Sequence, residues 1–226
     1  MKRSATRLSI TLMFLILSFS ACNDKSSNTT TGTNANSKDP TAGSVKSAAR
    51  PQPDTQVAVI ETADYGRIVI ELYPNIAPRM VERFKKLISE KFYDGTAVHR
   101  VDQSLGIIQG GDPLTKGSNS AVYGTGNSPY PNVPAEFSDI PYERGTLGAA
   151  RTSDINGANC QWFITLKKQP AFDKKYTVFG HVIEGINNVE VIMNAPTMPG
   201  TPTPSDKVVI KSVTLQPRAN FPASNP

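Results

Sequence analysis

The chain has 226 residues, of which 38% are hydrophobic and 19% are charged, with a net charge of +5. One domain is expected at roughly 100–200 residues per domain, and the low apolar content places part of the length outside a folded core. Two Cys and two His exclude a disulfide-rich scaffold and argue against a zinc site. Residues 1–56 carry a net charge of +4 and residues 57–226 only +1. The folded part therefore lacks the excess of positive charge that a dedicated nucleic-acid-binding protein carries.

The N-terminus has the features of an export signal. Basic residues precede an uncharged apolar run over residues 8–19, and small residues follow it. The run is shorter than the ~20 residues that a membrane-spanning helix needs, so it fits the apolar core of a signal peptide. Residues 1–21 are the predicted signal peptide.

Residues 19–22 (Phe-Ser-Ala-Cys) resemble a bacterial lipobox, in which the cysteine is diacylated and becomes the new N-terminus. Phe19 is the departure, because Leu is usual there. The resemblance implies lipidation of Cys22, with palmitate among the acyl chains. It also implies an exported chain anchored to a bacterial membrane, its domain facing the periplasm or the extracytoplasmic space. An ordinary signal peptide with an incidental cysteine is the alternative.

A polar segment separates Cys22 from the rest of the chain. Residues 23–56 contain no Leu, Ile, Met or aromatic residue, and Val45 is their only branched aliphatic residue. Such a segment cannot bury enough apolar surface to offset its ordering entropy. We therefore expect a disordered linker over residues 22–56, and its flexible part would span ~30–35 Å. With Cys22 lipidated, Cys160 remains alone, as an inert core thiol without a disulfide.

From residue 57 onward the pattern is of short strands with two helices. Residues 57–62 and 66–73 predict a hairpin, because apolar residues alternate along the second segment. Pro78 opens a predicted helix to about Ser89, whose apolar residues recur at helical spacing. Further strands are predicted near residues 97–101, 106–109, 146–149, 161–166 and 176–183, then a short helix from about 186 to 193 and a closing strand over 207–215.

Many short strands, long loops and only two helices predict a mainly β barrel or sandwich rather than a parallel α/β fold. About 160 residues suffice for one substantial core. The predicted domain covers residues 57–216, and residues 217–226 form a predicted disordered tail. Nothing in the sequence indicates an oligomer, so a monomer is expected.

Five fragments, in order along the chain, resemble those of one known family. They are FYDGTAVHRV (92–101), IIQGGD (107–112), ARTSD (150–154), QWFI (161–164) and YTVFG (176–180). Together they resemble the cyclophilins, which are peptidyl-prolyl cis–trans isomerases, over about residues 57–215. The resemblance implies a closed antiparallel eight-stranded barrel capped by two helices. It further implies proline-containing polypeptides as partners and neither a metal nor another cofactor.

The resemblance also implies roles for single residues. Arg100 matches the catalytic arginine, Gln109 the glutamine that holds the substrate carbonyl, and Phe163 the floor of the proline pocket. Without the resemblance these would be a solvated arginine, a buried amide and a core phenylalanine. The implied substrate-binding residues are Ile107, Ala150, Thr152, Phe172 and Tyr176.

The chain departs from the family pattern in two places. Gly106 falls where a phenylalanine normally lines the pocket, and Leu105 is expected to take its place, one residue being extra between Arg100 and Gln109. Ala171 stands where the family has a tryptophan that contacts cyclosporin. Losing the indole removes apolar surface and an N–H donor, so we expect weak inhibition by cyclosporin. Residues 124–126 and 136–137 are expected to form the loop over the second side of the groove.

Two functions of different classes follow. One is an enzyme that accelerates X–Pro isomerisation while exported proteins fold, by aiming an arginine at the proline nitrogen and so weakening amide resonance. The other is a non-catalytic module that binds proline-containing peptides in the same groove. The intact set of Arg100, Gln109 and Phe163 favours the enzyme over that module and over a mere lipid-tethered spacer.

Overall fold

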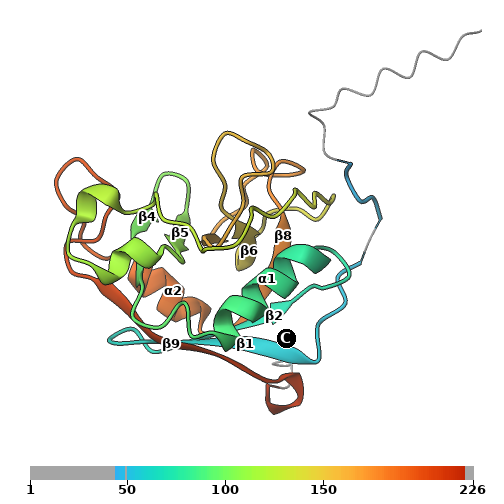
Figure 1. Cartoon of the computed structure of the whole chain (residues 1–226), viewed down its shortest axis with the longest axis horizontal. Coiled ribbons are helices and arrows are strands. Elements are labelled where there is room, and N and C mark those ends of the chain that lie inside the picture. Colours follow the sequence, from blue (N-terminus) through green and yellow to red (C-terminus); the bar gives the residue numbers. More distant parts are fainter. Residues whose placement is uncertain (1–43, 49, 222–226) are drawn as a thin grey trace, which may run out of the picture. The chain divides into compact units, whose positions relative to one another are not determined.

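The computed structural model describes residues 44–48 and 50–221 (Figure 1). This part of the chain contains nine β-strands, two α-helices and three short 3-10 helices. The strands are β1 (Gln56–Thr62), β2 (Arg67–Leu72), β3 (Ala97–Val98), β4 (Arg100–Asp102), β5 (Ile107–Gly110), β6 (Thr146–Ala149), β7 (Trp162–Thr165), β8 (Val178–Glu184) and β9 (Val208–Pro217). The helices are α1 (Pro78–Ser89) and α2 (Ile186–Met193).

The strands form one sheet in the order β3-β9-β1-β2-β8-β6-β7-β5-β4, and every pair of neighbours is antiparallel. β3 and β4 lie at opposite ends of this order, yet only His99 separates them in the chain. The sheet therefore curls into a nearly closed barrel. This confirms the predicted mainly β fold, and counting β3 and β4 as one strand gives the predicted eight.

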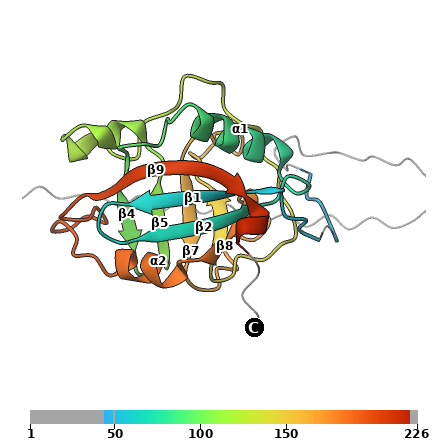
Figure 2. The ribbon, with the colours of Figure 1, turned by 90° about the horizontal axis from the view of Figure 1, so that it is seen from below.

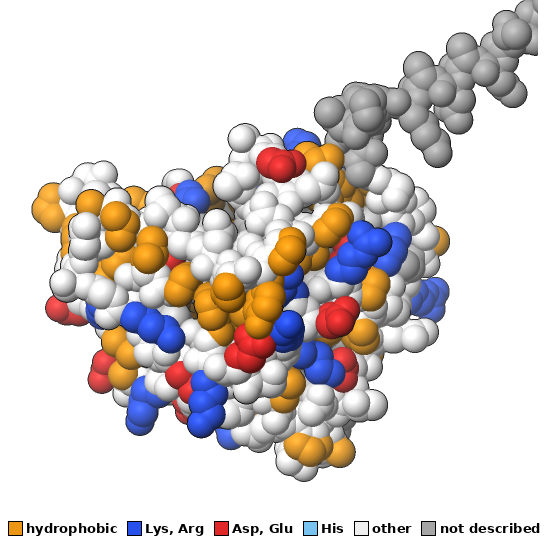
Figure 3. Space-filling view, viewed as in Figure 1, with side chains coloured by type: hydrophobic (Ala, Val, Ile, Leu, Met, Phe, Trp, Pro, Cys, Tyr) orange, Lys and Arg blue, Asp and Glu red, His pale blue; other side chains and the backbone are white. Residues whose placement is uncertain are grey.

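The two helices lie on opposite sides of the strands (Figure 2). α1 has the predicted bounds, and its buried residues, Phe84 among them, pack into the barrel core. Glu136 caps its first turn by accepting hydrogen bonds from the backbone N–H groups of Arg79 (3.2 Å) and Met80 (3.0 Å). Glu136 was expected beside the peptide groove, and this cap is its actual position. On the face that carries α1, Lys and Arg are interspersed with Asp and Glu (Figure 3).

Strands β5 and β7 present two different apolar faces because side chains alternate along a strand. Ile108 and Ile164 lie opposite each other and belong to the main core inside the barrel. Ile107 and Phe163 point to the other side, where they join a second apolar cluster with Tyr142. This outer face carries the candidate site.

The domain begins before the residue at which the sequence analysis placed it. Within the predicted linker, the backbone N–H of Lys46 donates to Phe137 O (2.9 Å), and its Nζ donates to Ile76 O (2.7 Å). Asp54 pairs with Lys85 of α1 at 2.9 Å. Polar backbone and charged side chains thus hold these residues on the domain, which an argument from apolar content does not predict.

The C-terminal residues 217–221, expected in a disordered tail, also pack on the domain. Phe221 is buried against Val57, Val59 and Val69, which face outward from the β1–β2 hairpin. The guanidinium of Arg218 donates to Glu71 (3.0 Å) and to the carbonyl of Phe221 (2.6 Å). This short segment therefore covers an apolar strip that the hairpin would otherwise expose.

Candidate active site

Three of the predicted residues form a row across neighbouring strands. Arg100 of β4 lies opposite Gln109 of β5, and Gln109 lies opposite Phe163 of β7. Residues directly opposite one another on one face of an antiparallel sheet have Cβ atoms about 4.5–5.5 Å apart. Strand register therefore brings together a cation, an amide and an aromatic ring from segments far apart in the sequence.

A pocket of about 310 Å³, most of whose lining residues are apolar or aromatic, lies over this row. Phe163 contacts the rings of Phe172 and Tyr176 edge-on, with centroid separations of 5.6 and 5.7 Å. Tyr142 stacks on Phe163 at 5.5 Å from the other side. The full lining is Arg100, Leu105, Ile107, Gln109, Ala150, Arg151, Phe163, Phe172 and Tyr176. The structure thus brings together every predicted site residue in its described part except Thr152.

Thr152 lines an adjoining pocket of about 360 Å³, which shares Gln109, Ala150 and Arg151 with the first. Gly124 lines this second pocket as expected for the loop over the groove. The two pockets together form one groove, lined mostly by apolar and aromatic residues at one end and mostly by polar residues and glycine at the other.

A chain of amides fixes the orientation of Gln109. Its Nε2 donates to Oε1 of Gln161 at 3.0 Å. Nε2 of Gln161 in turn donates to the carbonyls of Gly124 (3.0 Å) and Gly126 (2.9 Å). The Oε1 atom of Gln109 is consequently turned away from Gln161 and can accept a hydrogen bond. Gln161 was only part of a motif at the sequence level, and its supporting role comes from the structure.

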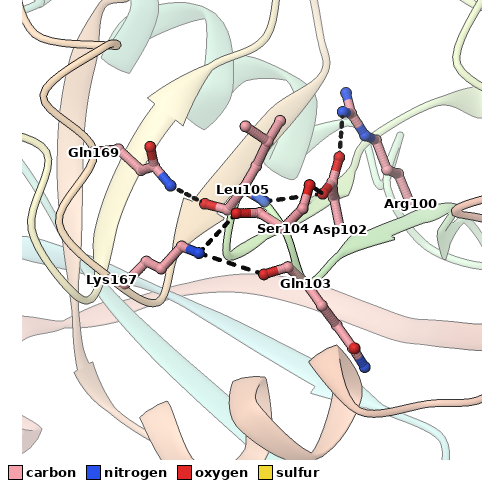
Figure 4. A network of polar contacts seen from close by, with 7 residues as sticks. All are labelled: Arg100, Asp102, Gln103, Ser104, Leu105, Lys167 and Gln169. Atoms are coloured by element: carbon pink, nitrogen blue, oxygen red, sulfur yellow. Dashed lines mark hydrogen bonds and ion pairs between the residues drawn. The ribbon is translucent and has the colours of Figure 1, made fainter.

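Arg100 forms an ion pair with Asp102, at 2.7 Å between Nη2 and Oδ2 (Figure 4). The other carboxylate oxygen accepts hydrogen bonds from the Ser104 hydroxyl (2.7 Å) and the Leu105 N–H (3.0 Å). Burial alone would raise the pKa of Asp102, but these hydrogen bonds and the arginine outweigh it and lower the pKa to about 2. Asp102 is therefore ionised throughout the physiological range. Sequence reasoning missed it, although its spacing of two from Arg100 on a strand put both on one face.

The loop after Asp102 explains the departure at Gly106. Leu105 lines the pocket as expected. Gly106 has φ +64° and a Cβ there would lie 2.7 Å from Cγ of Lys167, so an aromatic side chain at this position would strain the backbone and displace Lys167. Lys167 and Gln169 hold the loop by donating to carbonyls of residues 103–105 (Figure 4).

Two further predictions concern residues around the site. Ala171 is exposed and is not among the residues that line the pocket, in contrast to the neighbouring Phe172. Cys160 is fully buried, and burial raises the pKa of its thiol to about 12. A thiol with such a pKa is not a nucleophile at neutral pH.

Comparison with known proteins places this geometry in a family. Residues 57–215 match the family model of cyclophilin-type peptidyl-prolyl cis–trans isomerases. The chain belongs to this family. It is 40% identical over 154 residues to a probable peptidyl-prolyl cis–trans isomerase of Brucella suis, covering 66% of this chain and 77% of that protein. It is also 34% identical over 163 residues to the chicken peptidyl-prolyl cis–trans isomerase-like 3, covering 70% and 96% of the two chains.

Solved cyclophilin structures have the same fold. A Cryptosporidium parvum cyclophilin matches with a TM-score of 0.64 and 27% identity, over 76% of this chain and 99% of that one. A second structure of the same protein, in the presence of the dipeptide Ala-Pro, matches with a TM-score of 0.63 and 27% identity, over 71% of this chain and 98% of that one. The chain is thus a cyclophilin-type peptidyl-prolyl cis–trans isomerase.

The structure does not reach the predicted membrane anchor. Cys22 and the predicted signal peptide lie outside the described residues. Within the described part of the chain, no helix combines the length and the apolar character needed to span a bilayer.

Proposed function

We propose that this isomerase accelerates X–Pro exchange in exported proteins as they fold, with Arg100 as the donor to the proline nitrogen. Gln109 holds the substrate carbonyl, and Phe163 is the floor of the pocket that takes the proline ring. The observation that carries this assignment is the row of these three residues in cross-strand register beneath a pocket lined mostly by apolar and aromatic residues.

The chemistry needs no covalent step. The partial double-bond character of the C–N bond gives a rotation barrier of ~18–20 kcal/mol. When the bond is twisted, the nitrogen recovers a lone pair, and a donor aimed at it stabilises only that state. A charged hydrogen bond contributes ~1.5–3 kcal/mol, roughly one to two powers of ten in rate. The rest of the acceleration must come from holding the proline ring and the carbonyl in place.

Asp102 supports this role of Arg100. Only Nη2 of Arg100 donates to it, so within the described part of the chain Nε and Nη1 remain for a substrate. The ion pair restricts the guanidinium to the edge of the pocket, which lowers the entropy lost on binding. Asp102 is therefore a positioning residue.

The test is the cis-to-trans exchange of a short Ala-Pro peptide, followed with the full chain in detergent. We expect Arg100→Ala to lower kcat/KM at least tenfold, which is about 1.4 kcal/mol of transition-state stabilisation. The matched control is Arg144→Ala, because Arg144 is an exposed arginine paired with Glu190 and lines neither pocket. Binding of proline peptides without any acceleration would instead assign the groove to a non-catalytic module.

The proposal that the enzyme acts in the cell envelope is argued from the sequence. The apolar run and the lipobox-like residues 19–22 support an exported chain that is lipidated at Cys22. Growth with labelled palmitate should label the wild-type chain and not Cys22→Ala. Label-free wild-type protein in the soluble fraction would overturn the anchor and leave the isomerase activity unaffected.

A further inference from the structure

Arg151 stands on the wall between the two pockets of the groove. It follows β6 directly after Ala150, and both residues line both pockets. A side chain at this position is close to the proline pocket and to the pocket that takes the neighbouring part of a bound peptide. The charge of Arg151 can therefore act on the substrate residues next to the proline.

Neutral groups hold the guanidinium of Arg151 in place. It lies over the ring of Tyr176, with Cζ 4.6 Å from the centroid. Its Nε and Nη2 donate to Lys175 O at 3.3 and 3.1 Å. Its Nη1 donates to the carbonyls of Thr152 (2.9 Å) and Ser153 (3.4 Å). Oriented in this way, the side chain loses little further entropy when it contacts a substrate.

The charge of Arg151 has no counterpart in the groove. Arg100, the other cation in the lining, is paired with Asp102, whereas Arg151 forms no ion pair within the described residues. Among the residues that the structure describes, neither Asp nor Glu lines either pocket. Two acidic residues flank the segments whose carbonyls hold Arg151, and both accept hydrogen bonds from other groups: Asp173 from Tyr142 N (2.8 Å) and Asp154 from Asn156 N (2.9 Å).

We propose that Arg151 determines specificity, so that the enzyme prefers substrates with an acidic residue next to the proline. This inference rests on the proposed use of the pocket. A carboxylate beside the proline would meet an oriented, uncompensated arginine and no like charge. Because the groove is open to solvent, we expect a modest preference of about threefold to fivefold for Glu over the isosteric Gln, the range of partly exposed ion pairs.

The experiment compares kcat/KM of the full chain for Ala-Glu-Pro-Ala, Ala-Gln-Pro-Ala and Ala-Lys-Pro-Ala, and for the matching series with the variable residue after the proline. We expect the order Glu, Gln, Lys in at least one series, with the Glu-to-Gln ratio falling towards one in high salt. Arg151→Gln should bring the ratio to about one, and Arg151→Lys should retain part of it. Arg144→Gln removes the same charge outside both pockets and should leave the ratio unchanged.

The outcomes separate this inference from the proposed function. If the wild-type chain turns over all peptides but its Glu-to-Gln ratio of kcat/KM is near one in both series, the inference is overturned and the proposed isomerase site is unaffected. A ratio that persists in Arg151→Gln overturns the assignment to this residue. Absence of turnover with every peptide overturns the proposed function. In that case the Glu-to-Gln ratio of the dissociation constants, measured by calorimetry, tests the inference by the same criteria.

Discussion

The inner and outer faces of strands β5 and β7 carry the two different tasks of this molecule. On the inner face, Ile108 and Ile164 belong to the apolar cluster in the barrel core. On the outer face, Gln109 and Phe163 stand beside Arg100 and keep the peptide groove in shape. At the inner positions, a side chain that is apolar and of the right size is enough to fill the core. At the outer positions, the function depends on both the type of each residue and its strand register, because a register shift of one residue would point the site side chains into the barrel interior.

The largest expected effect is a loss of stability caused by a substitution on the inner face. Ile164→Ala should lower the free energy of unfolding by about 2–5 kcal/mol, because it leaves a cavity in a fully buried core. Urea denaturation measures this loss, while kcat/KM of the folded protein should stay within about twofold. Phe163→Leu, on the outer face, should do the reverse and lower kcat/KM more than stability. Equal effects of both variants on activity would contradict the separation of the two faces.

The next prediction concerns Gly148 of β6, which lies opposite Phe163. A Cβ at Gly148 would lie 2.5 Å from Tyr142 Oη and 2.8 Å from Cε1 of Phe163. Gly148→Ala should therefore displace the pocket floor, lower the free energy of unfolding by about 1–3 kcal/mol and reduce kcat/KM. The control is Gly117→Ala, since Gly117 is exposed and has φ −77°, which alanine adopts readily. Normal activity of Gly148→Ala would contradict this prediction, because it would show that catalysis does not depend on the exact position of the Phe163 ring.

A smaller effect is expected from Asp102→Asn. The amide keeps an acceptor for the N–H of Leu105 but removes the charge that holds Arg100. We expect kcat/KM to fall about threefold to tenfold, the range for loss of a charge-assisted hydrogen bond that positions another group. In the double variant Arg100→Ala with Asp102→Asn, the second change should have little further effect. Additive losses would mean that Asp102 acts independently of Arg100.

The smallest effect is a pH dependence of stability. Burial lowers the pKa of His99 and of His181, and the charges of Asp112 and Glu71 oppose this only in part. Below the unfolded value of ~6.5 the unfolded chain binds more protons than the folded one, so stability should fall from pH 7 to pH 5. Folding lowers the pKa of Asp102 as well, to about 2, so this group also destabilises the fold on acidification, but in a lower pH window. Its contribution is complete above ~pH 5 and is lost as the pH falls further.

Urea titrations at pH 7 and pH 5 measure this change in stability. kcat/KM of the folded protein should change little over the same range, because Asp102, the partner of Arg100, stays ionised. His99→Phe should flatten the change in stability. A steeper change in activity than in stability would place a titrating group within the site itself.

Local patterns in the sequence predicted the secondary-structure elements, and the resemblance to a family predicted most of the site. The bounds of α1 follow from Pro78 and from apolar residues at helical spacing, and the β1–β2 hairpin follows from alternation. The pocket residues came from motifs whose order matched a family, so their meeting was predicted by resemblance and not from their spacing. The roles of Arg100, Gln109 and Phe163 remain predictions that the kinetic experiments test.

Only the tertiary structure decided which groups far apart in the chain meet. The cap of α1 by Glu136, the support of Gln109 by Gln161 and the packing of Phe221 on the hairpin all join residues far apart in the chain. Hydrophobic periodicity reports which face of an element is buried, but it says nothing of the path of a loop. For the same reason the uncompensated charge of Arg151 was not visible in the sequence. It depends on the absence of Asp and Glu from the groove lining in the described part of the chain, which is a property of the assembled barrel.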